Sequence, residues 1–136
     1  MPDFRDIIER LERAEGAQRS TELARLCWQP FKDRPDDIEL SIRLEQALGD
    51  DLSAIGAAVW LVERLLPGWR FVNLCEWDHP TLRARGPWTC DLAPPDHADK
   101  LPNLRNKCPH APTPALAVLI ALFRSLRDAK TEERGG

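Results

Sequence analysis

The sequence predicts an α+β fold in which helices pack on a small antiparallel sheet of two or three strands, in an arrangement like an α/β/α sandwich. Two observations predict it. Three stretches have the apolar spacing or the almost continuous apolar content of buried helices, namely 4–11, 54–66 and 115–126. Between the last two, residues 69–77 alternate as strands do, and residues 87–92 are the expected partner strand.

The first helix is expected from Asp3, as N-cap, to a stop near Gly16. Its apolar stripe consists of Phe4, Ile7, Ile8 and Leu11. A second, short helix is expected from Ser20 to Trp28, with Leu23, Leu26 and Cys27 on its apolar face. Pro30 ends it, and the composition of residues 29–36 predicts a loop.

Residues 37–48 fit two structures. Ile38, Leu40, Ile42 and Leu44 alternate with polar residues, which is the period of a strand. The segment is also rich in Leu, Glu, Gln, Arg and Ala, which favour helices, and Gly49 follows as a natural end. We therefore favour a helix and keep the strand as the alternative.

The next helix begins with Ser53 as N-cap and stops at Pro67-Gly68. In the following strand, one face carries Trp69, Phe71, Asn73, Cys75 and Trp77, and the other carries Arg70, Val72, Leu74 and Glu76. One of the two faces is expected to be fully buried.

A long connection at 78–86 and a segment with five prolines at 93–113 are expected to form loops, the latter with at most a short edge strand. Thr113 and Pro114 then start the last helix, which is apolar from Ala115 to Phe123. This run predicts a helix that is buried on more than one side or meets a partner.

Length and composition predict one domain. The chain has 136 residues, of which 43% are hydrophobic and 30% charged. We expect a single α+β domain at 1–128, made of N-terminal helices (3–28), an ambiguous segment (29–52) and a core (53–128). Residues 129–136 are expected to be a flexible tail.

The net charge of −3 disfavours nucleic-acid binding, which depends on neutralising phosphates. The C-terminal loops carry five basic residues, Arg83, Arg85, Lys100, Arg105 and Lys107, but these are spread over loops that also hold Asp91, Asp96 and Asp99. No signal peptide or membrane-spanning apolar run is visible, so we expect a cytoplasmic protein with reduced cysteines.

Two motifs resemble a known family. LVERLLPGWRF (61–71) joins a helix to a strand, and APTPALAVLIALFRSL (111–126) forms the last helix. With IIERLERAEG and ELARLCW near the N-terminus, they resemble the phage ABA sandwich domain family, over about residues 5–28 and 53–127. The resemblance implies a fold and a phage or prophage setting. It implies no activity, because the motif residues are structural.

One group of residues has the chemistry of zinc ligands. It consists of Cys75, His79, Cys90, His97, Cys108 and His110. Their spacing matches no zinc motif, since the chain has no Cys-x2-Cys, and cysteines on strands are ordinary core residues. We therefore predict no metal or cofactor and keep a zinc site as an alternative hypothesis.

Catalytic patterns are weaker. No nucleophile signature or phosphate-binding glycine loop is present, so no catalytic residues are predicted. The paired acids Asp36-Asp37 and Asp50-Asp51 precede predicted helices, where a negative charge interacts favourably with the helix dipole. Of the five tryptophans, Trp28 and Trp77 are candidates for exposed anchors, although core packing is the preferred interpretation.

The sequence therefore favours a non-enzymatic phage or prophage accessory protein that binds a protein partner or forms a homodimer. Its surplus of apolar helix surface, chiefly in 54–66 and 115–123, motivates this hypothesis. The alternatives are a nucleic-acid-associated phage factor and a zinc-binding domain.

Overall fold

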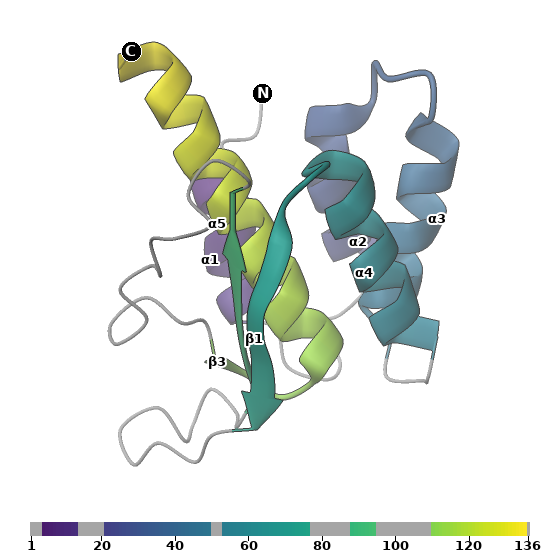
Figure 1. Cartoon of the computed structure of the whole chain (residues 1–136). Coiled ribbons are helices and arrows are strands. Elements are labelled where there is room, and N and C mark those ends of the chain that lie inside the picture. Colours follow the sequence, from purple (N-terminus) through teal and green to yellow (C-terminus); the bar gives the residue numbers. More distant parts are fainter. Residues whose placement is uncertain (1–3, 14–20, 50–52, 77–87, 95–109, 136) are drawn as a thin grey trace.

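The computed structural model describes residues 4–13, 21–49, 53–76, 88–94 and 110–135. Along the chain, the helices are α1 (Phe4–Glu12), α2 (Thr21–Trp28), the short 3-10 helix η2 (Gln29–Phe31), α3 (Asp37–Ala47), α4 (Ser53–Leu65) and α5 (Pro114–Gly135). The strands are β1 (Arg70–Glu76), β2 (Trp88–Ala93) and β3 (His110–Ala111). The sheet is antiparallel with the order β1-β2-β3, so the predicted α+β fold is confirmed (Figure 1).

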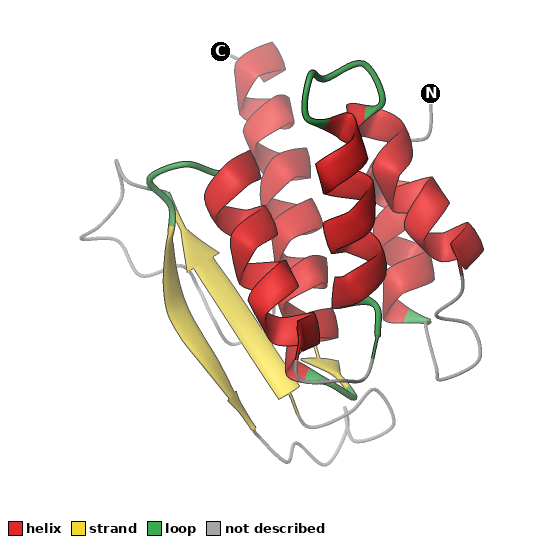
Figure 2. Cartoon of the chain, turned by 90° about the vertical axis from the view of Figure 1, so that its right-hand side faces the viewer, coloured by secondary structure: helices red, strands yellow, loops and turns green. Residues whose placement is uncertain are grey.

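The described helices lie on one side of the sheet, so the described residues form two layers and not the three of the expected α/β/α-like sandwich (Figure 2). α5 is central: it contacts the strands on one side and α1, α3 and α4 elsewhere. This position explains the apolar run of α5, because every residue from Ala115 to Phe123 is buried. Contacts among the described residues therefore bury the apolar surface of this helix, and no partner is needed to cover it.

The start of α5 is as predicted. Thr113 accepts a hydrogen bond at its Oγ1 from the Leu116 amide (3.2 Å), and Pro114 is the first helical residue. The end differs, since the predicted tail at 129–136 is incorporated into the helix as far as Gly135. The physical reason is composition: the segment from Asp128 contains Ala, Lys, Glu and Arg and no Pro or Gly before Gly135.

The N-terminal helices pack as their apolar spacing predicts. Ile7, Ile8 and Leu11 are buried, and Glu12 pairs with Arg124 of α5 (Nη2 to Oε1, 2.5 Å). The predicted loop at 29–36 is wrong at its beginning, because Gln29–Phe31 forms η2. Phe31 is buried there, and its ring centroid lies 6.2 Å from that of Phe123 in α5. Burial of this aromatic ring favours a compact turn over an extended loop.

The ambiguous segment is helical, as favoured, and forms α3. α4 ends before Pro67, where Gly68 takes a positive φ of 86° that turns the chain into β1.

β1 departs from strict alternation. Its pairing with β2 shifts between Phe71 and Asn73, so Val72 lies in a bulge. Leu74 is opposite Cys90, and both pack with Leu92 in the core, whereas Phe71, opposite Leu92, is 36% exposed. The prediction of a strand with one fully buried face is therefore wrong, because no residue of β1 is buried. The physical reason is that β1 is an edge strand of the sheet, and both of its ends are exposed.

Candidate interaction surface

α3 is held in place by one apolar stripe. Leu40, Leu44 and Ala47 are buried, each with at most 1% of its surface exposed, and they contact α2, α4 and α5. Burial of leucine side chains at this level contributes about 2 kcal/mol each, which is enough to fix the rotation of so short a helix. The opposite side of α3 is therefore presented to solvent in a defined orientation.

That opposite side carries a second apolar stripe. Ile38 is 74% exposed and Ile42 is 50% exposed, and they lie one helical turn apart. Two residues along a helix rotate the side chain by about 200°, so an alternating apolar pattern in a helix produces two stripes on opposite sides. The pattern that resembled a strand is thus a helix with one buried and one exposed apolar stripe.

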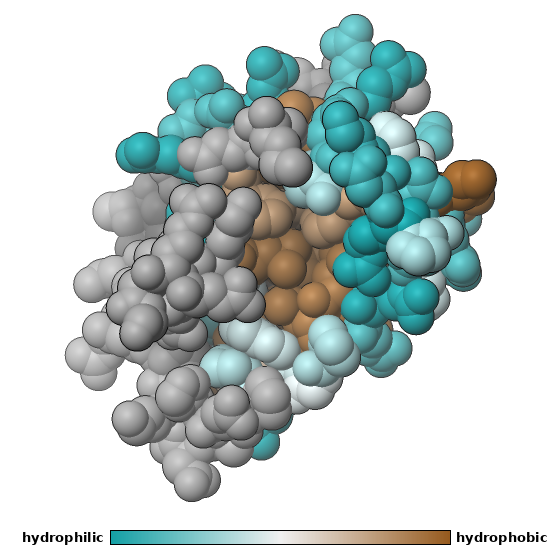
Figure 3. Space-filling model, turned by 90° about the horizontal axis from the view of Figure 1, so that it is seen from above, coloured by the Kyte–Doolittle hydropathy of each residue, from teal (hydrophilic) through white to brown (hydrophobic). Residues whose placement is uncertain are grey.

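The exposed stripe borders a shallow depression of about 620 Å³. Its lining residues are Pro35, Asp36, Ile38, Glu39, Ile42, Arg43 and Gln46. Seen from above, an apolar group projects from a hydrophilic surface on the side of the molecule where α3 lies (Figure 3). We call the exposed side of α3, from Pro35 to Gln46, the α3 face.

Charged groups flank the isoleucines on the α3 face. Arg43 Nη2 lies 3.8 Å from Glu39 Oε1, and both side chains are partly exposed, at 36% and 54%. Arg43 also packs over the indole of Trp60 in α4, with 5.2 Å between its Cζ and the ring centroid. The face is therefore an apolar centre beside one acid and one base.

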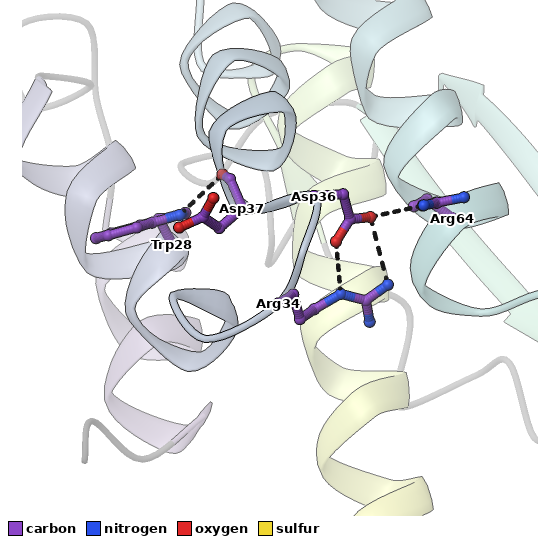
Figure 4. A network of polar contacts seen from close by, with 5 residues as sticks. All are labelled: Trp28, Arg34, Asp36, Asp37 and Arg64. Atoms are coloured by element: carbon purple, nitrogen blue, oxygen red, sulfur yellow. Dashed lines mark hydrogen bonds and ion pairs between the residues drawn. The ribbon is translucent and has the colours of Figure 1, made fainter.

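A second network fixes the start of α3 (Figure 4). Asp36 accepts hydrogen bonds from Arg34 (Nε to Oδ1, 3.0 Å) and from Arg64 of α4 (Nε to Oδ2, 2.6 Å). Asp36 stands at the N-cap position, but its side chain makes no capping hydrogen bond because the arginines engage it. Trp28 of α2 donates from Nε1 to the Asp37 carbonyl (2.9 Å). Asp36 thus ties α3 to α4 from the start of the helix, where the sequence predicted its negative charge to lie.

The Asp36 network predicts a defined acid sensitivity. Hydrogen bonds from Arg34, and then from Arg64, lower the pKa of the Asp36 carboxyl from 3.8 to about 2. Since the folded-state pKa lies below the unfolded one, the stabilisation is complete above pH 3.8 and is lost as the pH falls through about 2. The difference in unfolding free energy between wild type and Asp36→Asn should be constant at neutral pH and shrink between those values.

Urea unfolding at a series of pH values measures this difference. Asp33→Asn, in the same turn region and exposed, is the matched control and should show no such loss. A wild-type advantage over Asp36→Asn that persisted undiminished at pH 2 would contradict the network.

The tryptophan expectations are largely met. Trp60, Trp69 and Trp88 pack against the core as predicted. Trp28, a candidate exposed anchor, is also half-buried, and its indole N–H is satisfied within the fold. Trp77, the other candidate, lies outside the described residues.

The structure separates two of the proposed zinc ligands. Cys75 is opposite Thr89 in the sheet, with Sγ 3.6 Å from Oγ1, whereas Cys90 is opposite Leu74. Neighbouring positions on a strand point to opposite faces, so Cys90 is buried toward the helices and Cys75 lies on the other face. One ion cannot bind both thiols in this register.

Most of the other predicted zinc ligands, and the basic residues named for nucleic-acid binding, lie outside the described residues. His79, His97 and Cys108 lie outside the described residues, as do Asp50, Asp51 and all five basic residues named for nucleic-acid binding. Of His110 the backbone alone is described, in β3. Within the described ranges, no three His, Cys, Asp or Glu side chains form a group that could hold a metal ion.

Comparison with known protein families, curated proteins and solved structures found no match to this chain. Among the described residues, no helix has both the length and the apolar content that crossing a bilayer requires.

Proposed function

We propose that the protein is a non-enzymatic interaction module that binds a macromolecular partner through the α3 face. The observation that carries the proposal is the exposure of Ile38 and Ile42 on a helix whose other side is anchored in the core. Exposing two neighbouring isoleucines has a cost in water, which a partner would remove by burying them. A phage or prophage accessory role is part of this proposal and rests on the resemblance in 61–71 and 111–126.

The rigidity of the α3 face supports this role. α3 is tied to α2 by the Trp28 hydrogen bond and to α4 by the Asp36–Arg64 pair and the Arg43–Trp60 contact. A surface that is ordered before binding loses little conformational entropy on association. The charged side chains of Glu39 and Arg43 lie next to the apolar stripe. The face therefore has an apolar centre and a polar rim, as protein interfaces do.

Site-specific photocrosslinking in the native host tests the proposal. A photoreactive amino acid at Gln46, which lines the depression, should give a discrete crosslinked protein species. The same amino acid at Glu9, exposed on α1, is the matched control and should give none. Absence of any crosslinked protein from Gln46, or equal products from both positions, would contradict an interaction role for the α3 face.

A further inference from the structure

We infer that the partner of the α3 face is a second copy of this chain, bound through an antiparallel α3–α3 contact. This inference rests on the proposed function, because it names the occupant of the same surface. It is carried by the order of side chains along the exposed side of α3.

The α3 face is complementary to itself under a two-fold axis. Glu39 and Arg43 lie one turn apart on the same flank of the isoleucine stripe. When two copies pack antiparallel about an axis near residues 40 and 41, residues on the same flank meet, and Glu39 of one copy lies beside Arg43 of the other. The two-fold axis generates this opposite-charge pair twice.

The same axis brings the apolar residues together. Ile38 of one copy meets Ile42 of the other, so four isoleucine side chains cover one another at the centre of the contact. In a parallel two-fold arrangement, the flanks that carry Glu39 and Arg43 lie on opposite sides of the contact, so no such opposite-charge pair forms between the copies. The charge order therefore selects the antiparallel orientation.

The contact is expected to be weak. α3 has 11 residues, and a single pair of such helices buries less than the roughly 1,200–2,000 Å² of stable interfaces. Sedimentation velocity should therefore be measured from about 10 μM to 1 mM, the range in which weak interfaces associate. We expect a monomer–dimer equilibrium in this range, which Ile42→Asp abolishes.

Charge reversal tests the orientation. Glu39→Lys makes both flank residues positive and Arg43→Glu makes both negative, so each variant alone should dimerise about tenfold more weakly than wild type. An equimolar mixture of the two should dimerise again, because each copy then faces the opposite charge. Arg25→Glu, a charge reversal on the exposed side of α2, is the control and should leave dimerisation unchanged.

The outcomes are distinct. A chain that remains monomeric at the highest concentration, or a dimer that survives Ile42→Asp, overturns the inference. Failure of the mixture to restore association overturns the antiparallel register. If Gln46 crosslinks to a protein of another mass while the chain is monomeric, the proposed function stands and the second-copy partner is wrong. The absence of both a crosslink and a dimer would overturn the proposed function and the second-copy inference together. Unchanged circular dichroism of each variant shows that folding is not the cause.

Discussion

Replacing Phe123 with alanine should lower the free energy of unfolding by about 3–5 kcal/mol, the usual cost of removing a buried phenylalanine ring. Phe123 is fully buried in α5. Its ring centroid lies 6.0 Å from that of Phe4 in α1 and 6.2 Å from that of Phe31 in η2. The substitution therefore leaves a cavity where three elements meet, and their neighbours cannot all move in to fill it.

Urea unfolding followed by tryptophan fluorescence measures this loss. A domain of this size has about 5–15 kcal/mol of stability in total, so Phe123→Leu, which leaves a smaller cavity, provides a second measurement if the alanine variant is largely unfolded. Phe71→Ala is the matched control, because Phe71 is 36% exposed and should cost much less. Equal losses at positions 71 and 123 would contradict the central placement of α5.

The Cys27 thiol should be almost unreactive in the folded protein. Cys27 has no exposed surface, and burial raises the pKa of its thiol from 9.0 to about 12. At pH 8 this shift lowers the thiolate fraction by about a thousandfold relative to the unfolded chain, and the thiolate is the reactive form. Cys75, which is exposed, should react readily under the same conditions.

Alkylation with iodoacetamide, followed by peptide mass spectrometry, measures both thiols in one sample. Trypsin places Cys27 in the peptide 26–32 and Cys75 in the peptide 71–83, so the wild-type chain needs no substitution. Labelling of Cys27 should require urea, whereas labelling of Cys75 should not. Similar native rates for the two cysteines would show that the α2 side of the core is open.

The amino-acid pattern predicted the helices better than the details of the sheet. Ile7, Ile8 and Leu11 define a stripe that is local, and their burial follows from the helical period alone. The bulge at Val72 depends on how β1 is paired with β2, a contact between distant segments, so the alternation from Trp69 to Trp77 gave no sign of it. The continuation of α5 to Gly135 was missed for another reason. The charged segment 129–136 was interpreted as a solvated tail, although its residues favour a helix.

The candidate surface was only partly visible in the sequence. Ile38, Leu40, Ile42 and Leu44 stood out as an alternating set, but as a possible strand. The same alternation has another meaning in a helix, where it forms two apolar stripes on opposite sides. The Asp36–Arg64 pair spans 28 residues and left no local signal. The expected apolar surplus was assigned to α4 and α5, and the fold buries that of α5.

The sequence by itself determined the fold class, the start of α5 at Thr113-Pro114, the end of α4 before Pro67, and the apolar residues available for a core, because these depend on local period and backbone preference. Only the tertiary structure decided that α5 is central, that Cys75 and Cys90 face apart, and that α3 turns its isoleucines outward. Each of these depends on which distant segments pack together, and a helix with two apolar stripes shows which one is buried only after its neighbours occupy the other side.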